Sequence, residues 1–87
     1  MVGQKHDLYH RVLEIAEDYL GPAAQRFIDR QITNHLSKRP QELALKDMPV
    51  LIDWTRLAVA LLTEDTHLIH EFSDRLSQLS KQTKSSS

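Results

Sequence analysis

Several residue types are scarce in this 87-residue chain, and each shortage excludes a class of protein. The chain contains no cysteine, which excludes a disulfide scaffold, a thiol nucleophile and a cysteine-ligated zinc or iron–sulfur centre. It contains only two glycines and three prolines, too few for an all-β fold with many tight turns. Its most apolar stretch, residues 50–62, includes two charged residues and is far shorter than the roughly 20 apolar residues of a membrane span.

An excess of charge of either sign is also missing. Eleven basic residues face twelve acidic ones, the formal net charge is −1, and both signs are spread evenly along the chain. A balanced surface of this kind does not attract nucleic acid or anionic lipid over long range. Residues 1–10 lack the apolar core of a secretory signal. We therefore expect a cytoplasmic protein that does not bind membranes.

What the chain does have is apolar residues at helical spacing almost throughout. This spacing predicts helices over about 4–20, 22–37, 47–62 and 64–80, with a short helical turn near 41–45. Gly21-Pro22 should separate the first two helices, and Thr63 should cap the fourth. Short connections favour antiparallel neighbours. The predicted fold class is therefore all-α, a small four-helix bundle-like domain (up-down or orthogonal) over residues 1–80. Residues 81–87 should form a disordered polar tail.

The third predicted helix is apolar on more than one side, which is unusual for so small a domain. One explanation is that the other three helices surround it. The other is that one apolar face binds a partner, of which a second copy of the chain is the commonest. One apolar stripe consists of Val50, Trp54, Leu57, Ala58 and Leu61. Leu57 and Leu61 are the core residues of this helix if that stripe faces the core. The residues predicted for the interface are Ile52, Trp54, Val59 and Leu62.

The main alternative function is nucleic-acid binding by a basic side of the second helix. Arg26, Arg30, Lys38 and Arg39 would supply the phosphate contacts. Against this stand the balanced net charge and the interruption of the basic residues by Asp29.

Histidine is the residue type best suited to chemistry, but its spacing is not that of a known site. His6 and His10 are four residues apart without the glutamate of a zinc-protease motif. Glu64 and His67 have the spacing of a carboxylate-bundle ligand pair, but no second copy of the pair exists. His35 is expected on the apolar side of the second helix. No nucleophile elbow, phosphate-binding loop or dinucleotide motif is present. We therefore predict no metal, no cofactor and no enzymatic activity.

Residues 20–24, Leu-Gly-Pro-Ala-Ala, precede a helix rich in arginine, phenylalanine and isoleucine. This segment resembles small helical modules of bacterial regulatory proteins, and it is too short to indicate a named family or a function. The sequence as a whole predicts a small protein–protein interaction or regulatory module that forms a homodimer through an apolar helix face.

Overall fold

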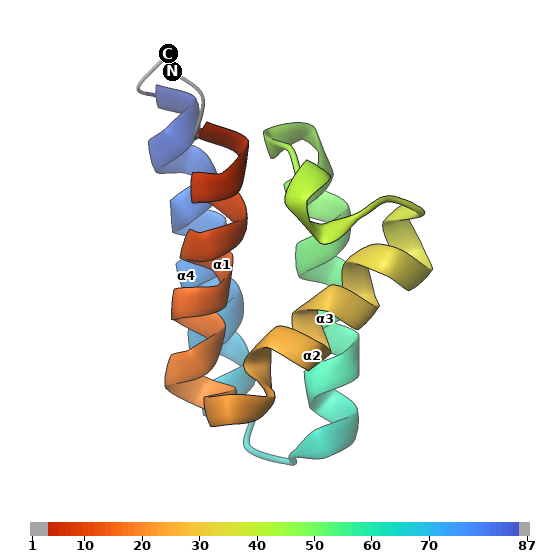
Figure 1. The fold of residues 1–87 in the computed structure, drawn as a ribbon. Coiled ribbons are helices and arrows are strands. Elements are labelled where there is room, and N and C mark those ends of the chain that lie inside the picture. Colours follow the sequence, from red (N-terminus) through yellow and green to blue (C-terminus); the bar gives the residue numbers. More distant parts are fainter. Residues whose placement is uncertain (1–3, 86–87) are drawn as a thin grey trace.

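The fold is built from helices joined by short turns. The computed structural model describes residues 4–85, and the side chains of residues 8–81. The four α-helices are α1 (Gln4–Leu20), α2 (Ala24–Gln31), α3 (Met48–Leu62) and α4 (Thr66–Ser85). Figure 1 shows α1 and α4 side by side in opposite directions, with α2 crossing obliquely toward α3. The all-α class is confirmed, but the regular bundle is not, because α2 has only eight residues.

The segment expected to form one helix over 22–37 is divided into three parts. A 3-10 turn (Gly21–Ala23) precedes α2, and a π-helical turn (Ile32–Leu36) follows it. Gly21 has a φ of 63°, a left-handed conformation that glycine adopts without a steric penalty as the chain leaves α1. A π turn is wider than an α turn, so the residues after Ile32 leave the 3.6-residue register. His35, expected on the apolar side, is consequently exposed.

One hydrophobic core lies between the helices. Among the residues whose side chains are described, the buried polar ones are Gln31 and Thr55, and the Thr55 hydroxyl has no hydrogen-bond partner there. The Phe72 ring stacks on Tyr19 with 5.0 Å between ring centroids, which joins α4 to α1. The buried apolar side chains are Leu8, Tyr9, Val12, Ala16, Ala24, Ile28, Ile32, Leu43, Met48, Leu51, Ile52, Val59, Phe72, Leu76 and Leu79.

The start and end of α4 differ from the prediction. The helix begins at Thr66, and the Asp65 carboxylate accepts a hydrogen bond from the Leu68 N–H at 3.2 Å. Asp65 is therefore the capping residue, and Thr63 instead accepts a hydrogen bond from the Asp65 N–H. The helix continues to Ser85, whereas we expected a disordered tail from residue 81; residues 86–87 lie outside the described part of the chain.

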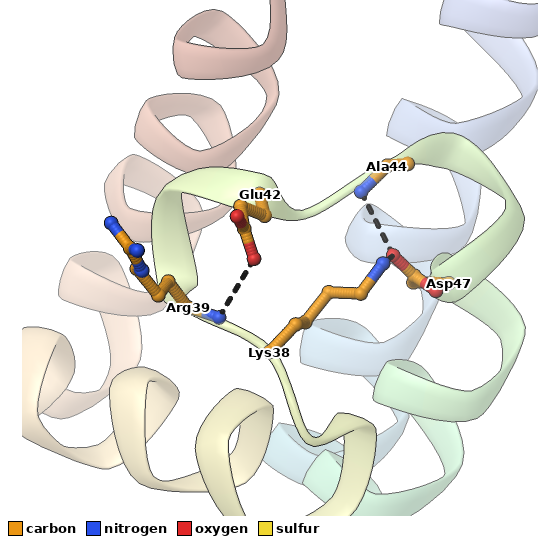
Figure 2. Close-up of polar contacts among 5 residues, drawn as sticks. All are labelled: Lys38, Arg39, Glu42, Ala44 and Asp47. Atoms are coloured by element: carbon orange, nitrogen blue, oxygen red, sulfur yellow. Dashed lines mark hydrogen bonds and ion pairs between the residues drawn. The ribbon is translucent and has the colours of Figure 1, made fainter.

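The connection from α2 to α3 contains two 3-10 turns, Pro40–Glu42 and Leu45–Asp47. In each turn an acidic side chain accepts a hydrogen bond from the backbone N–H three residues earlier, Glu42 from Arg39 and Asp47 from Ala44 (Figure 2). Asp47 also forms a largely buried ion pair with Lys38, 2.7 Å apart. Burial by itself raises the pKa of Asp47. The Lys38 ammonium and the Ala44 N–H together lower it by more than burial raises it, so the pKa lies below its usual value.

None of the helices within residues 4–85 has the length and the apolar character required to cross a membrane.

A partly buried hydrogen bond between α1 and α2 should make the stability of the protein depend on pH in alkaline solution. The Tyr9 hydroxyl donates to the Asp29 carboxylate, and burial together with that carboxylate raises the pKa of Tyr9 to about 12. Because the pKa of an unfolded tyrosine is about 10, this stabilisation is present below pH ~10 and lost as the pH rises to ~12. Tyr9→Phe should therefore lower the free energy of unfolding by about 1–2 kcal/mol at neutral pH.

Urea unfolding of both proteins between neutral pH and pH ~12 measures this effect. The difference between wild type and Tyr9→Phe should shrink toward zero at the alkaline end, because the wild-type tyrosine ionises there. A difference that stays constant across the range would show that the hydrogen bond does not couple to ionisation of Tyr9.

Candidate interaction surface

Helix α3 packs against α2 and α4 on one side and exposes large apolar side chains to solvent. Leu57 is 58% exposed, Leu61 is 88% exposed and Leu62 is 65% exposed. Val50 and Trp54 are each exposed by about two fifths. Within the described residues, these five are the exposed large apolar side chains, and all lie on one helix. Four of them, Val50, Trp54, Leu57 and Leu61, lie along one side of the helix, and we call these four the apolar face of α3.

The structure reverses the expected assignment of the two sides of α3. Ile52 and Val59, predicted for the interface, are buried in the core, whereas Leu57 and Leu61, expected in the core, face solvent. Trp54 and Leu62, also predicted for the interface, are exposed. The buried stripe is centred on Thr55, which is 2% exposed. The sequence pattern does not identify this stripe as the buried one, because a polar residue, Thr55, stands at its centre.

Trp54 has a defined orientation on this face. Its indole stacks on the imidazole of His35, with ring centroids 3.8 Å apart and planes 4° from parallel. His35 comes from the π-helical turn, so the register shift that exposes His35 also brings it to α3. An aromatic residue held in place loses less conformational freedom when a partner covers it. The sequence contained no signal for this stack, because the two residues are 19 positions apart on different elements.

An apolar cleft adjoins the C-terminal end of the face. Leu62 forms part of its wall, and its volume is about 320 Å³. The cleft opens between the end of α1, the start of α2 and the α3–α4 connection. It extends the apolar surface beyond α3 itself. The remaining lining residues are Tyr19, Leu20, Ala23, Phe27, Val59, Thr63 and Leu68.

Two opposite charges border the apolar face. Asp53 and Arg56 are exposed, lie three residues apart, and so share one edge of the helix. Neither forms an ion pair within the described part of the chain. On the other edge Ala58 is half-buried where α3 meets the core. The face therefore has one charged border and one border against the protein interior.

The basic residues proposed for nucleic-acid binding do not all remain available. Arg26 and Arg30 are exposed one turn apart on α2, and Arg39 is exposed in the connection that follows. Lys38 is ion-paired with Asp47 and half-buried (Figure 2). The Lys38 charge is thus neutralised within the fold.

The histidines do not assemble a metal site in the described residues. Among these residues, no group of three or more histidine, aspartate or glutamate side chains is placed to hold a metal ion. His67 and His70 are exposed on α4, and His10 lies beside the Tyr9 ring. The His6 side chain lies outside the described side chains.

The features that remain for function are thus the apolar face of α3, the Trp54–His35 stack and the two bordering charges. Comparisons with protein-family models, with curated proteins and with solved structures found no match to this chain.

Proposed function

We propose that this protein is a cytoplasmic protein–protein interaction module, not an enzyme, and that it self-associates through the apolar face of α3. The observation that carries the proposal is the concentration of every exposed large apolar side chain of the described residues on one helix. Contiguous apolar patches of this kind mark interaction sites in soluble proteins. A second copy presents the same face, and the two-fold dimer is the commonest oligomer of soluble proteins.

The apolar area is sufficient for a dimer of moderate affinity. In a two-fold dimer the four side chains of this face are buried in each copy, and each burial contributes on the order of 1–2 kcal/mol. The gross gain of roughly 8–16 kcal/mol is offset by about 4–15 kcal/mol of lost translational and rotational freedom. We therefore expect a dissociation constant on the order of micromolar.

Light scattering over a concentration series tests the proposal. The wild-type chain of 10.1 kDa should approach twice that mass as the concentration rises, and added salt should not dissociate it, since apolar contacts are not screened. Leu57→Asp should remain helical by circular dichroism but dissociate about 100-fold more readily, because two buried leucines are replaced by two charges. Gln78→Asp, which adds the same charge at an exposed position on α4, is the matched control and should dimerise normally.

The alternatives give different results. A wild-type chain that stays monomeric up to about 1 mM, well above the expected dissociation constant, would contradict self-association. A dimer that Leu57→Asp leaves intact would place the interface away from α3. Nucleic-acid binding through Arg26, Arg30 and Arg39 would instead appear as binding of a duplex that falls steeply with salt.

A further inference from the structure

We propose that His35 makes self-association through the apolar face of α3 sensitive to pH, so that the dimer weakens in mildly acidic solution. This inference rests on the proposed function and adds a regulatory group to the same surface. The observation that carries it is the stack of His35 on Trp54, which brings a titratable side chain onto an apolar face.

The stack puts the imidazole of His35 where a partner has to cover it. Trp54 belongs to the apolar face, and the imidazole lies almost parallel to its indole, with 3.8 Å between the ring centroids. His35 is exposed, so its own copy does not shield it from a partner. Because the two rings are in direct contact, a second copy that packs on Trp54 also removes water from His35.

The charge of a histidine determines how costly it is to cover. Histidine is the residue type whose charge changes between mildly acidic and neutral solution, since its ordinary pKa is about 6.5. Moving a protonated imidazole from water into apolar surroundings costs far more than moving the uncharged ring, unless an opposite charge pairs with it. A second copy that covers the stack therefore binds the uncharged form more tightly. By linkage, association then releases protons, and added protons oppose association.

Charged groups of both signs lie on the elements around the stack, with the basic ones in excess. The π-helical turn that carries His35 packs against α2 and α3 and leads into the connection before α3. Among the described side chains, no carboxylate forms an ion pair with the imidazole. The charged residues of α2, the connection and α3 are Arg26, Asp29, Arg30, Lys38, Arg39, Glu42, Lys46, Asp47, Asp53 and Arg56.

The carboxylates of this set do not neutralise a proton on His35. Asp29, Glu42 and Asp47 each accept a hydrogen bond from another group of the same copy. The remaining one, Asp53, lies one turn from the exposed Arg56 on the same edge of α3, so these two charges offset each other. Protonation of His35 therefore leaves a net positive charge on the surface that the second copy has to cover.

Protonation of His35 should weaken association without unfolding the single copy. In the free copy the exposed imidazole stays in contact with water whether or not it carries a proton. The face of an indole ring attracts a cation, so the protonated ring also keeps its place on Trp54. The circular dichroism spectrum should therefore be the same in neutral and in mildly acidic solution, which separates this effect from acid unfolding.

Light scattering over a concentration series, at pH ~7.5 and pH ~5.5 and at constant salt, tests the inference. A histidine of ordinary pKa changes from about one tenth to about nine tenths protonated over this range. Because the dimer contains two copies of His35, the dissociation constant of the wild type should be about 10- to 100-fold higher at the lower pH.

Variants of single histidines assign the effect to a residue. His35→Phe keeps an aromatic ring on Trp54 but cannot take up a proton, so its dissociation constant should be nearly the same at both pH values. His35→Gln, which also cannot be protonated in this range, repeats the comparison without an added apolar ring. His70→Gln removes an exposed histidine of α4 and is the matched control, which should keep the full wild-type response to pH.

The outcomes separate this inference from the proposed function. A wild-type dimer that is equally tight in both solutions, or tighter in the acidic one, would overturn the role of His35 and leave self-association standing. The same would follow if both His35 variants weakened in acid as much as the wild type, because another group would then carry the response. A chain that stays monomeric in both solutions would overturn the proposed function together with this inference.

Discussion

Val59→Asp should unfold this protein, whereas Leu61→Asp should leave it folded. The two residues lie half a turn apart on α3, but Val59 is 1% exposed and Leu61 is 88% exposed. A carboxylate at position 59 has to be protonated or brought to water, at a cost of several kcal/mol. Small domains are stable by only about 5 kcal/mol, so this cost removes most or all of the folded state. Circular dichroism during thermal unfolding at neutral pH measures the difference.

The control within this comparison is Leu61→Asp itself, which adds the same carboxylate. Because position 61 is exposed, the free energy of unfolding of the Leu61→Asp protein should differ from that of the wild type by less than about 0.5 kcal/mol. The measurement is made below the concentration at which dimers form. Ile52→Asp should behave like Val59→Asp, since Ile52 is also buried. If Leu61→Asp unfolded and Val59→Asp did not, the buried and exposed sides of α3 would be those first expected from the sequence.

Phe72→Ala should destabilise the protein by about 3–5 kcal/mol. Phe72 is the largest fully buried side chain, and it stacks on Tyr19 at 5.0 Å between centroids with planes 21° apart. Removing its ring leaves a cavity between α1 and α4 that neighbouring side chains fill only in part. Urea unfolding at neutral pH gives the change as a lower midpoint at unchanged slope.

An exposed ion pair lies beside the stack of Phe72 on Tyr19, and it serves as the comparison for Phe72→Ala. Arg75 forms an ion pair with Asp18 at 2.7 Å, and its guanidinium lies 5.5 Å from the Tyr19 ring centroid. Both charged side chains are about half exposed, so Asp18→Ala should cost less than about 1 kcal/mol. Equal effects of Asp18→Ala and Phe72→Ala would mean that the stacked rings do not anchor α4 to α1.

The sequence predicted the long helices because their signals agree at every level. The bounds of α1, Gln4–Leu20, follow from apolar spacing that ends at a glycine and a proline. The end of α3 at Leu62 follows from apolar spacing that stops before Thr63, and Met48 is buried as expected. The predicted entrance to α3 was right in position, although the Asp47 side chain bonds to Ala44 and does not cap α3.

What the sequence could not show depends on contacts between elements. Both sides of α3 carry apolar residues at helical spacing, and only the packing of the other helices decides which side is covered. The π-helical turn has no local signature in residues 32–36, so the exposure of His35 and its stack on Trp54 were missed. Threonine and aspartate are both favoured helix caps, and Thr63 and Asp65 are only two residues apart. The sequence alone therefore does not distinguish which of them caps α4.

The position of Trp54 in this stack on α3 also determines what the tryptophan fluorescence of the protein reports. Trp54 is the only tryptophan of the chain, and it lies on an exposed face against His35, away from the core. Its fluorescence therefore records the surroundings of that face and not the integrity of the interior. A shift in emission with rising concentration, at constant circular dichroism, signals that the face has been covered. Emission can likewise stay almost unchanged while distant helices loosen, so unfolding is best followed through the backbone.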